Sequence, residues 1–177
     1  MNKIITTTIM GLAIFAMTGC NFLKIGDKGV AIELSRTDFI NEGLDMMSKC
    51  TEAQLAVSAL TIKIEKNIQG EEKEEYSYVA TIKDSEWEYS KELDPNQALE
   101  CSQQCVYWET NTLYKVCNLM NGEYGADKLK GYKFQKLANG EYVASGSGTE
   151  FTWNSSGLLK SHKTVLTSSS TTRTYIF

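Results

Sequence analysis

The chain has 177 residues, with 18 basic and 22 acidic side chains and a formal net charge of −4 at pH 7. Phosphate binding needs clustered Lys and Arg, and the sequence contains no basic block, so we expect no nucleic acid partner. The length beyond an N-terminal signal is that of one domain, which is enough to bury a sizeable core.

The first twenty residues have the organisation of an export signal. Lys3 supplies a positive start, residues 4–17 form a short apolar run, and Met17-Thr18-Gly19-Cys20 places small residues just before a cysteine. An apolar run of this length is too short to span a bilayer core of about 30 Å. The pattern therefore predicts an exported chain.

These residues resemble the signal and lipobox of bacterial lipoproteins. The resemblance implies a signal peptide at 1–19 and a diacylglyceryl group on Cys20, with a lipidated tether at 20–29. The length of the remainder predicts a single domain at 30–177. Asn21 follows the cysteine where aspartate is associated with inner-membrane retention, so it implies the outer membrane if the source is Gram-negative. An uncleaved amphipathic anchor, or an ordinary signal whose cysteine is incidental, is the alternative.

The first expected element of the domain is an amphipathic helix over about 36–49. Ser35 is a plausible N-cap, and Asp38 follows in the first turn. The apolar side chains recur at helical spacing, and they are Phe39, Ile40, Leu44, Met46 and Met47. We expect this stripe to face the core.

The period then changes to two, which predicts a β-hairpin. Leu60, Ile62 and Ile64 share one face of the first strand. An acidic turn at 69–74 separates this strand from a second alternating run at 76–83 of similar length.

The middle of the chain lacks a continuous apolar period. Asp94-Pro95-Asn96 breaks the pattern, and residues 97–104 are expected to form a loop or a short helical turn. Residues 105–117 are predicted to be a second hairpin that reverses around Asn111. This register places Val106, Trp108, Tyr114 and Val116 on the core face.

The last third is predicted to be an antiparallel meander with strands near 132–137, 141–145, 149–153, 158–167 and 171–177. Turn residues punctuate it at regular intervals, and aromatic and aliphatic side chains alternate with Thr and Ser. The expected fold class is therefore α+β: a curved antiparallel sheet, made of the hairpin and this meander, covered by the N-terminal amphipathic helix.

Lipidation of Cys20 would leave four of the five cysteines, and an even number in an exported protein predicts two disulfides. The hairpin register sets Cys105 opposite Cys117, which leaves Cys50 to pair with Cys101. The alternative is a structural zinc site made of the same four thiols, although their spacing matches no common zinc pattern.

The sequence offers little chemistry for an enzyme. His162 is the single histidine, and it lies in a predicted strand where we expect it on the surface. No zinc-protease, nucleophile-elbow or phosphate-loop motif occurs. We therefore predict a non-catalytic protein with no catalytic residue, no cofactor and no metal.

The order of elements, a helix, a long hairpin and then a strand meander with an apolar end, resembles that of periplasmic lipoprotein carriers and related mycobacterial lipid-binding lipoproteins. The resemblance implies a sheet groove closed by helices and carries over no functional residue. We expect a membrane-anchored envelope lipoprotein that binds a lipid or other apolar ligand. The alternative is a protein interaction module, such as an inhibitor, immunity protein or surface antigen, with a solid core.

Overall fold

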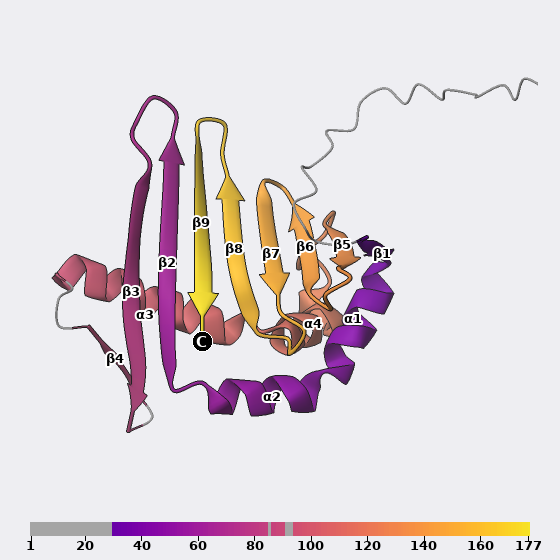
Figure 1. Cartoon of the computed structure of the whole chain (residues 1–177). Coiled ribbons are helices and arrows are strands. Elements are labelled where there is room, and N and C mark those ends of the chain that lie inside the picture. Colours follow the sequence, from indigo (N-terminus) through magenta and orange to yellow (C-terminus); the bar gives the residue numbers. More distant parts are fainter. Residues whose placement is uncertain (1–29, 85, 91–93) are drawn as a thin grey trace, which may run out of the picture.

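The computed structural model describes residues 30–84, 86–90 and 94–177, and Cys20 lies outside this part. The described chain is an α+β fold with four α-helices and one nine-stranded sheet (Figure 1). The strand order is β1-β5-β6-β7-β8-β9-β2-β3-β4, and every neighbouring pair is antiparallel.

The elements follow one another along the chain as β1 (Ile32–Leu34), α1 (Arg36–Asp45), α2 (Met47–Ala56), β2 (Ala59–Ile68), β3 (Glu74–Lys83), β4 (Glu86–Tyr89), α3 (Pro95–Thr110), α4 (Leu113–Asn121), the 3-10 helix η1 (Glu123–Gly125), β5 (Lys133–Lys136), β6 (Tyr142–Gly146), β7 (Thr149–Trp153), β8 (Leu159–Val165) and β9 (Ser169–Ile176).

The predicted N-terminal helix is present as two helices that meet at Met46. The Ser35 hydroxyl caps α1 by accepting a hydrogen bond from the Asp38 backbone N–H at 3.1 Å, as expected. Phe39 is fully buried and packs on Phe134 of β5, with ring centroids 4.5 Å apart. Met47 lies after the break and is 49% exposed, so the predicted apolar stripe ends before it.

The long hairpin is confirmed. Strands β2 and β3 pair in a register that sets Leu60 opposite Ala80 and Ile62 opposite Tyr78, and all four side chains are buried. The alternation of the sequence matches this register because only one face of the pair meets the core. The other edge of β2 pairs with β9, so β2 joins the hairpin to the meander.

The predicted hairpin at 105–117 is wrong, because this stretch is helical. Asp94 and Gln97 form a capping box, and Pro95 stands in the first turn of α3, where its missing N–H costs nothing. Cys101, Cys105 and Trp108 are buried at helical spacing, whereas Val106, which the hairpin placed in the core, is 55% exposed.

The prediction that the N-terminal helix covers the sheet also requires correction. Figure 1 shows α3 running across the strands and α4 beside it, on one side of the sheet. The N-terminal helix α1 reaches the sheet near β5, β6 and β7, where Phe39 meets Phe134, Tyr142 and Trp153. The central strands are therefore covered by α3 and α4, in the region where the sequence predicted a loop and a hairpin.

The meander is confirmed in its order, and the bounds of its strands β5 to β9 lie within two residues of the predicted ones. Strand β1 was not predicted, and it extends the sheet by pairing Leu34 with Phe134. A shift in register between β7 and β8 follows Thr152, so Trp153 pairs with Leu159.

Close contact between α1 and α4 gives a test of the helical interpretation. A Cβ added at Gly43 would lie 2.1 Å from the Cys117 sulfur. Gly to Ala inside a helix usually stabilises by up to about 1 kcal/mol. We expect Gly43→Ala instead to lower the free energy of unfolding by about 1 to 3 kcal/mol, measured by urea denaturation, because the helices must move apart.

The control is Cys117→Ala combined with Gly43→Ala, which removes the clashing sulfur. We expect this double variant to recover most of the stability that Gly43→Ala loses relative to the matched Cys117→Ala protein. A Gly43→Ala protein as stable as the wild type would show that α1 and α4 do not pack in this way.

Candidate ligand-binding site

A hollow of about 340 Å³ lies where α3 ends, α4 begins and the segment before β5 folds against β7. Its aromatic walls are Tyr107, Tyr132, Phe151 and Trp153, and its aliphatic walls are Val116 and Leu129. Its polar groups are Asn111, Asp127, Lys128 and Lys130. Pockets of this size, apolar with a few polar groups, are typical of small-molecule sites. We call it the aromatic pocket.

The ring of Phe151 is the centre of the aromatic wall. It stacks on Trp153 with centroids 5.8 Å apart and an angle of 19° between planes, and it lies 6.4 Å from the ring of Tyr132. Both Phe151 and Trp153 come from β7, two residues apart, so strand alternation points them to the same face. This arrangement gives the pocket an apolar wall on which a flat group can stack.

A second stack stands behind this wall. Phe151 and His162 are cross-strand neighbours on β7 and β8, and their rings are parallel within 5° at 4.8 Å. Tyr107 of α3 stacks on His162 at 5.0 Å. Tyr107 therefore closes the pocket on one side and covers the histidine on the other.

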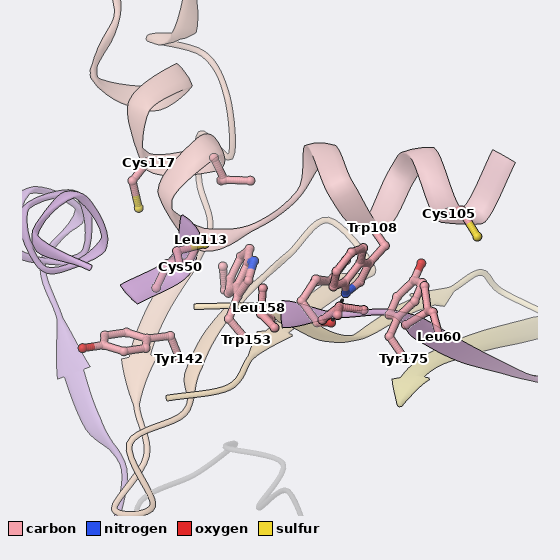
Figure 2. Close-up of a cluster of buried hydrophobic side chains, with 14 of the residues drawn as sticks. Cys50, Leu60, Cys105, Trp108, Leu113, Cys117, Tyr142, Trp153, Leu158 and Tyr175 are labelled. Carbon is pink, nitrogen blue, oxygen red and sulfur yellow. Dashed lines mark hydrogen bonds between the residues drawn. The ribbon is translucent and has the colours of Figure 1, made fainter. Parts of the chain in front are cut away.

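Two indole N–H groups hold the end of α3 on the sheet. Trp108 Nε1 donates to the Leu159 carbonyl at 3.0 Å, and Trp153 Nε1 donates to the Asn111 carbonyl at 2.6 Å. Figure 2 shows both indoles among the buried side chains between α3 and the sheet. Because Trp108 is fixed in this way, its neighbour Tyr107 is placed against β7 and β8.

The segment between η1 and β5 forms the outer wall of the pocket. Arg36 of α1 donates to the carbonyls of Lys128 at 2.9 Å and of Ala126 at 3.1 Å, so this segment is tied to the body of the fold. Leu129 lies in the left-handed region with φ of 53°, which is costly for a residue with a bulky side chain. The strained turn points an apolar side chain into the pocket.

His162 is not the surface histidine that the sequence predicted. It is half-buried in its stack, and Thr164 Oγ1 lies 3.3 Å from its Nε2. Burial, together with the positive charge of Arg173, lowers the pKa of His162 to about 4. The ring is therefore neutral at pH 7 and acts as an aromatic surface.

A larger hollow of about 500 Å³ lies between α2 and α3. It is lined by Leu55, Val57, Ile82 and Trp108, together with polar side chains of α2 and α3. Its apolar wall is mainly aliphatic, and it lacks stacked rings at its surface. The aromatic pocket differs from it in its stacked rings, which are suited to orienting a flat group.

An ionic cluster joins α1 to the edge of the sheet at β5 and β6. The carboxylate of Glu42 accepts hydrogen bonds from Lys136 Nζ and from the Tyr142 hydroxyl, both at 2.6 Å. The Lys136 bond, supported by Tyr142, lowers the pKa of Glu42. These groups satisfy one another and join α1 to β5 and β6.

The two predicted disulfides are not present. Cys50, Cys101, Cys105 and Cys117 are all buried as free thiols. The pairing of Cys105 with Cys117 depended on the hairpin, and these residues instead lie on α3 and α4. Cys50 donates a weak hydrogen bond to the Gly157 carbonyl and Cys117 to that of Phe39, both at 3.6 Å. Within the described ranges no cluster of side chains suited to a metal ion occurs, and the four thiols form no zinc site.

The predicted lipidation site, Cys20, precedes the described residues. Among the helices from residue 30 onward, none has both the length and the apolar character needed to cross a membrane. Comparison with known protein families and with curated protein sequences finds no match.

Sequence reasoning missed the pocket because it depends on α3. The predicted hairpin turns Tyr107, which lies between Val106 and Trp108, away from the core, whereas α3 places its ring on His162. The spacing of Phe151 and Trp153 in one strand was the available signal, since two aromatic rings on one face of a predicted strand need a partner.

The depressed pKa of His162 predicts a pH-dependent stability. The unfolded chain takes up a proton at this residue near pH 6.5, whereas the folded chain does so only near pH 4. The stability from this residue is therefore complete above pH 6.5 and is lost as the pH falls to 4. We expect a loss of roughly 1 to 2 kcal/mol, reduced by water around the half-buried ring.

The measurement is urea unfolding of the wild type and of His162→Gln at pH 7 and pH 4.5. The comparison isolates this residue, because acidic groups titrate in both proteins. Equal losses of stability in the two proteins would show that the histidine ring is not buried.

Proposed function

We propose that the protein is a lipid-anchored binding protein of the cell envelope, and that it holds a small ligand with a flat apolar face in the aromatic pocket. The anchor is proposed from the signal and Cys20, and the ligand site from the pocket. Two acyl chains on Cys20 would hold the chain stably at a membrane, at about 0.8 kcal/mol per buried CH₂. In a Gram-negative source that membrane is the outer one.

The observation that carries the binding role is the wall of stacked rings. Phe151 and Tyr132 present partly exposed rings to the pocket, and the fully buried ring of Trp153 supports Phe151 from within the fold. Exposed aromatic surface of this kind is stabilised when a ligand removes it from water. A volume of about 340 Å³ suits one or two fused rings or a short chain.

The ionisable groups around the pocket support binding in place of catalysis. His162 stays neutral because its pKa is held near 4. Burial raises the pKa of Tyr107 well above its usual value, so its hydroxyl keeps its proton. Lys130 is paired with Asp127 at 3.2 Å. A general base at neutral pH needs a pKa near 7, and neither His162 nor Tyr107 has one.

The alternative, a protein interaction role, has weaker support at the surface of α3. The outer face of α3 exposes Leu99 and Val106, which are 60% and 55% accessible and two helical turns apart. Their neighbours along the helix surface are polar, so they form no contiguous apolar patch of the kind that partners bind. The aromatic pocket is the stronger feature.

The ligand role is tested with N-phenyl-1-naphthylamine, an uncharged dye that fluoresces in apolar sites. The full chain carrying Cys20→Ser, which cannot be lipidated, serves as the binding protein. We expect Tyr132→Ala to weaken dye binding about three- to tenfold, because one aromatic contact contributes about 0.5 to 1.5 kcal/mol. The matched control is Tyr124→Ala, since Tyr124 is fully exposed nearby. Equal affinities of the two variants would exclude this pocket as the site.

The anchor is tested separately. We expect Cys20→Ser in the native host to give an unlipidated chain that is released from the membrane or left unprocessed, because only the thiol can accept the diacylglyceryl group. Metabolic labelling with a palmitate analogue is the measurement. Label on the Cys20→Ser protein equal to that on the wild type would show that Cys20 is not the lipidated residue.

A further inference from the structure

Arg173 of β9 is a cation for which the described chain supplies no counter-ion. It pairs with His162 of β8 on one side and with Ile64 of β2 on the other. Its Nε atom is buried and has no hydrogen-bond partner in the described residues, and none of the ion pairs found there includes its guanidinium. A half-buried guanidinium that is left unpaired is costly, so this group is prepared for an anion.

The surroundings of Arg173 are neutral or positive. Alternation from the buried Tyr175 places Arg173 on the side of the sheet that carries α3. The side chains on this face of β8, β9 and β2 include no carboxylate, and they are His162, Thr164, Ser169, Thr171, Tyr175, Leu60, Ile62, Ile64, Lys66 and Ile68. The acidic residues of α3 bind elsewhere, Glu100 to Tyr78 and Glu109 to Trp87.

Arg173 is also close to the aromatic pocket. Phe151, His162 and Arg173 are cross-strand neighbours on β7, β8 and β9. The backbones of Phe151 and Arg173 are therefore two strand spacings apart, about 10 Å. Tyr107 bridges this interval, since its ring stacks on His162 and also lines the pocket. The long arginine side chain and a ligand of one or two rings together cover the distance.

We propose that Arg173 binds an oxyanion on the ligand of the aromatic pocket, which makes the natural ligand an amphipathic anion. This inference rests on the proposed function. A guanidinium binds carboxylate, sulfonate or phosphate oxygens with two parallel N–H donors, which a lysine cannot reproduce. The apolar part stacks on Phe151, and the charged end passes the edge of Tyr107 to reach the arginine.

The test compares two dyes with nearly the same ring system, the uncharged N-phenyl-1-naphthylamine and the sulfonate 8-anilino-1-naphthalenesulfonate. We expect Arg173→Met to weaken binding of the sulfonate about 10- to 100-fold, as loss of a charged hydrogen bond does, and to change binding of the uncharged dye less than about twofold. Arg173→Lys should fall between the wild type and Arg173→Met. Lys163→Met, on the opposite face of β8, is the control for net charge and should leave both affinities unchanged.

The outcomes separate this inference from the proposed function. If the wild type binds neither dye, or if Tyr132→Ala leaves binding of the uncharged dye unchanged, the pocket itself is wrong. If the uncharged dye binds as expected but Arg173→Met leaves the sulfonate bound, or weakens both dyes equally, only the role of Arg173 is wrong. Near-ultraviolet circular dichroism confirms that each variant is folded, and Arg173→Lys provides the reading if Arg173→Met does not fold.

The source of the oxyanion is tested by competition. Displacement of the sulfonate dye by 2-naphthoate, but not by inorganic phosphate at the same concentration, supports an amphipathic anion. Displacement by inorganic phosphate alone, lost in Arg173→Met, would overturn the amphipathic ligand and assign a free oxyanion to the site.

Discussion

The attachment of α3 to the sheet is the constraint on which the rest of the arrangement depends. Trp108 donates to the Leu159 carbonyl, and Trp153 donates to the carbonyl of Asn111 at the end of the helix. Buried indole N–H groups need a partner, so these bonds fix both the position and the rotation of α3. The rotation sets Cys101, Cys105 and Trp108 into the core and leaves Tyr107 against His162. The pocket, its histidine and the arginine beside it all follow from this one placement.

The strands could be predicted because each has one buried face. Leu60, Ile62 and Ile64 alternate with polar residues in β2, and the observed register preserves this alternation. The region 95–117 could not be predicted in the same way, because alternate apolar residues such as Trp108, Tyr114 and Val116 fit a short strand as well as a helix. The decisive signal is Asp94-Pro95 with Gln97, which forms a helix start although the same residues also fit a break in the chain.

The candidate site was less predictable than the fold, because its residues come from separate elements. Phe151 and His162 meet as cross-strand neighbours, whereas Tyr107 is distant in the sequence and reaches them only because α3 crosses β7 and β8. A lone histidine in a Thr-rich strand gives no sign of its burial. The aromatic pocket lies at the edge of the helical layer, and no single strand or helix pattern in the sequence indicates it.

The most direct test of the account is the indole region of a ¹⁵N-correlated NMR spectrum, because the chain has three tryptophans and the structure gives each a different place. Trp153 lines the aromatic pocket, and Trp108 of α3 lines the larger hollow beside α2. Trp87 of β4 lies against Trp108. Addition of N-phenyl-1-naphthylamine should shift the indole signal of Trp153 in a saturable manner and leave that of Trp87 unchanged. A saturable shift of Trp108 or Trp87 with Trp153 unmoved would place the ligand outside the aromatic pocket and contradict the account.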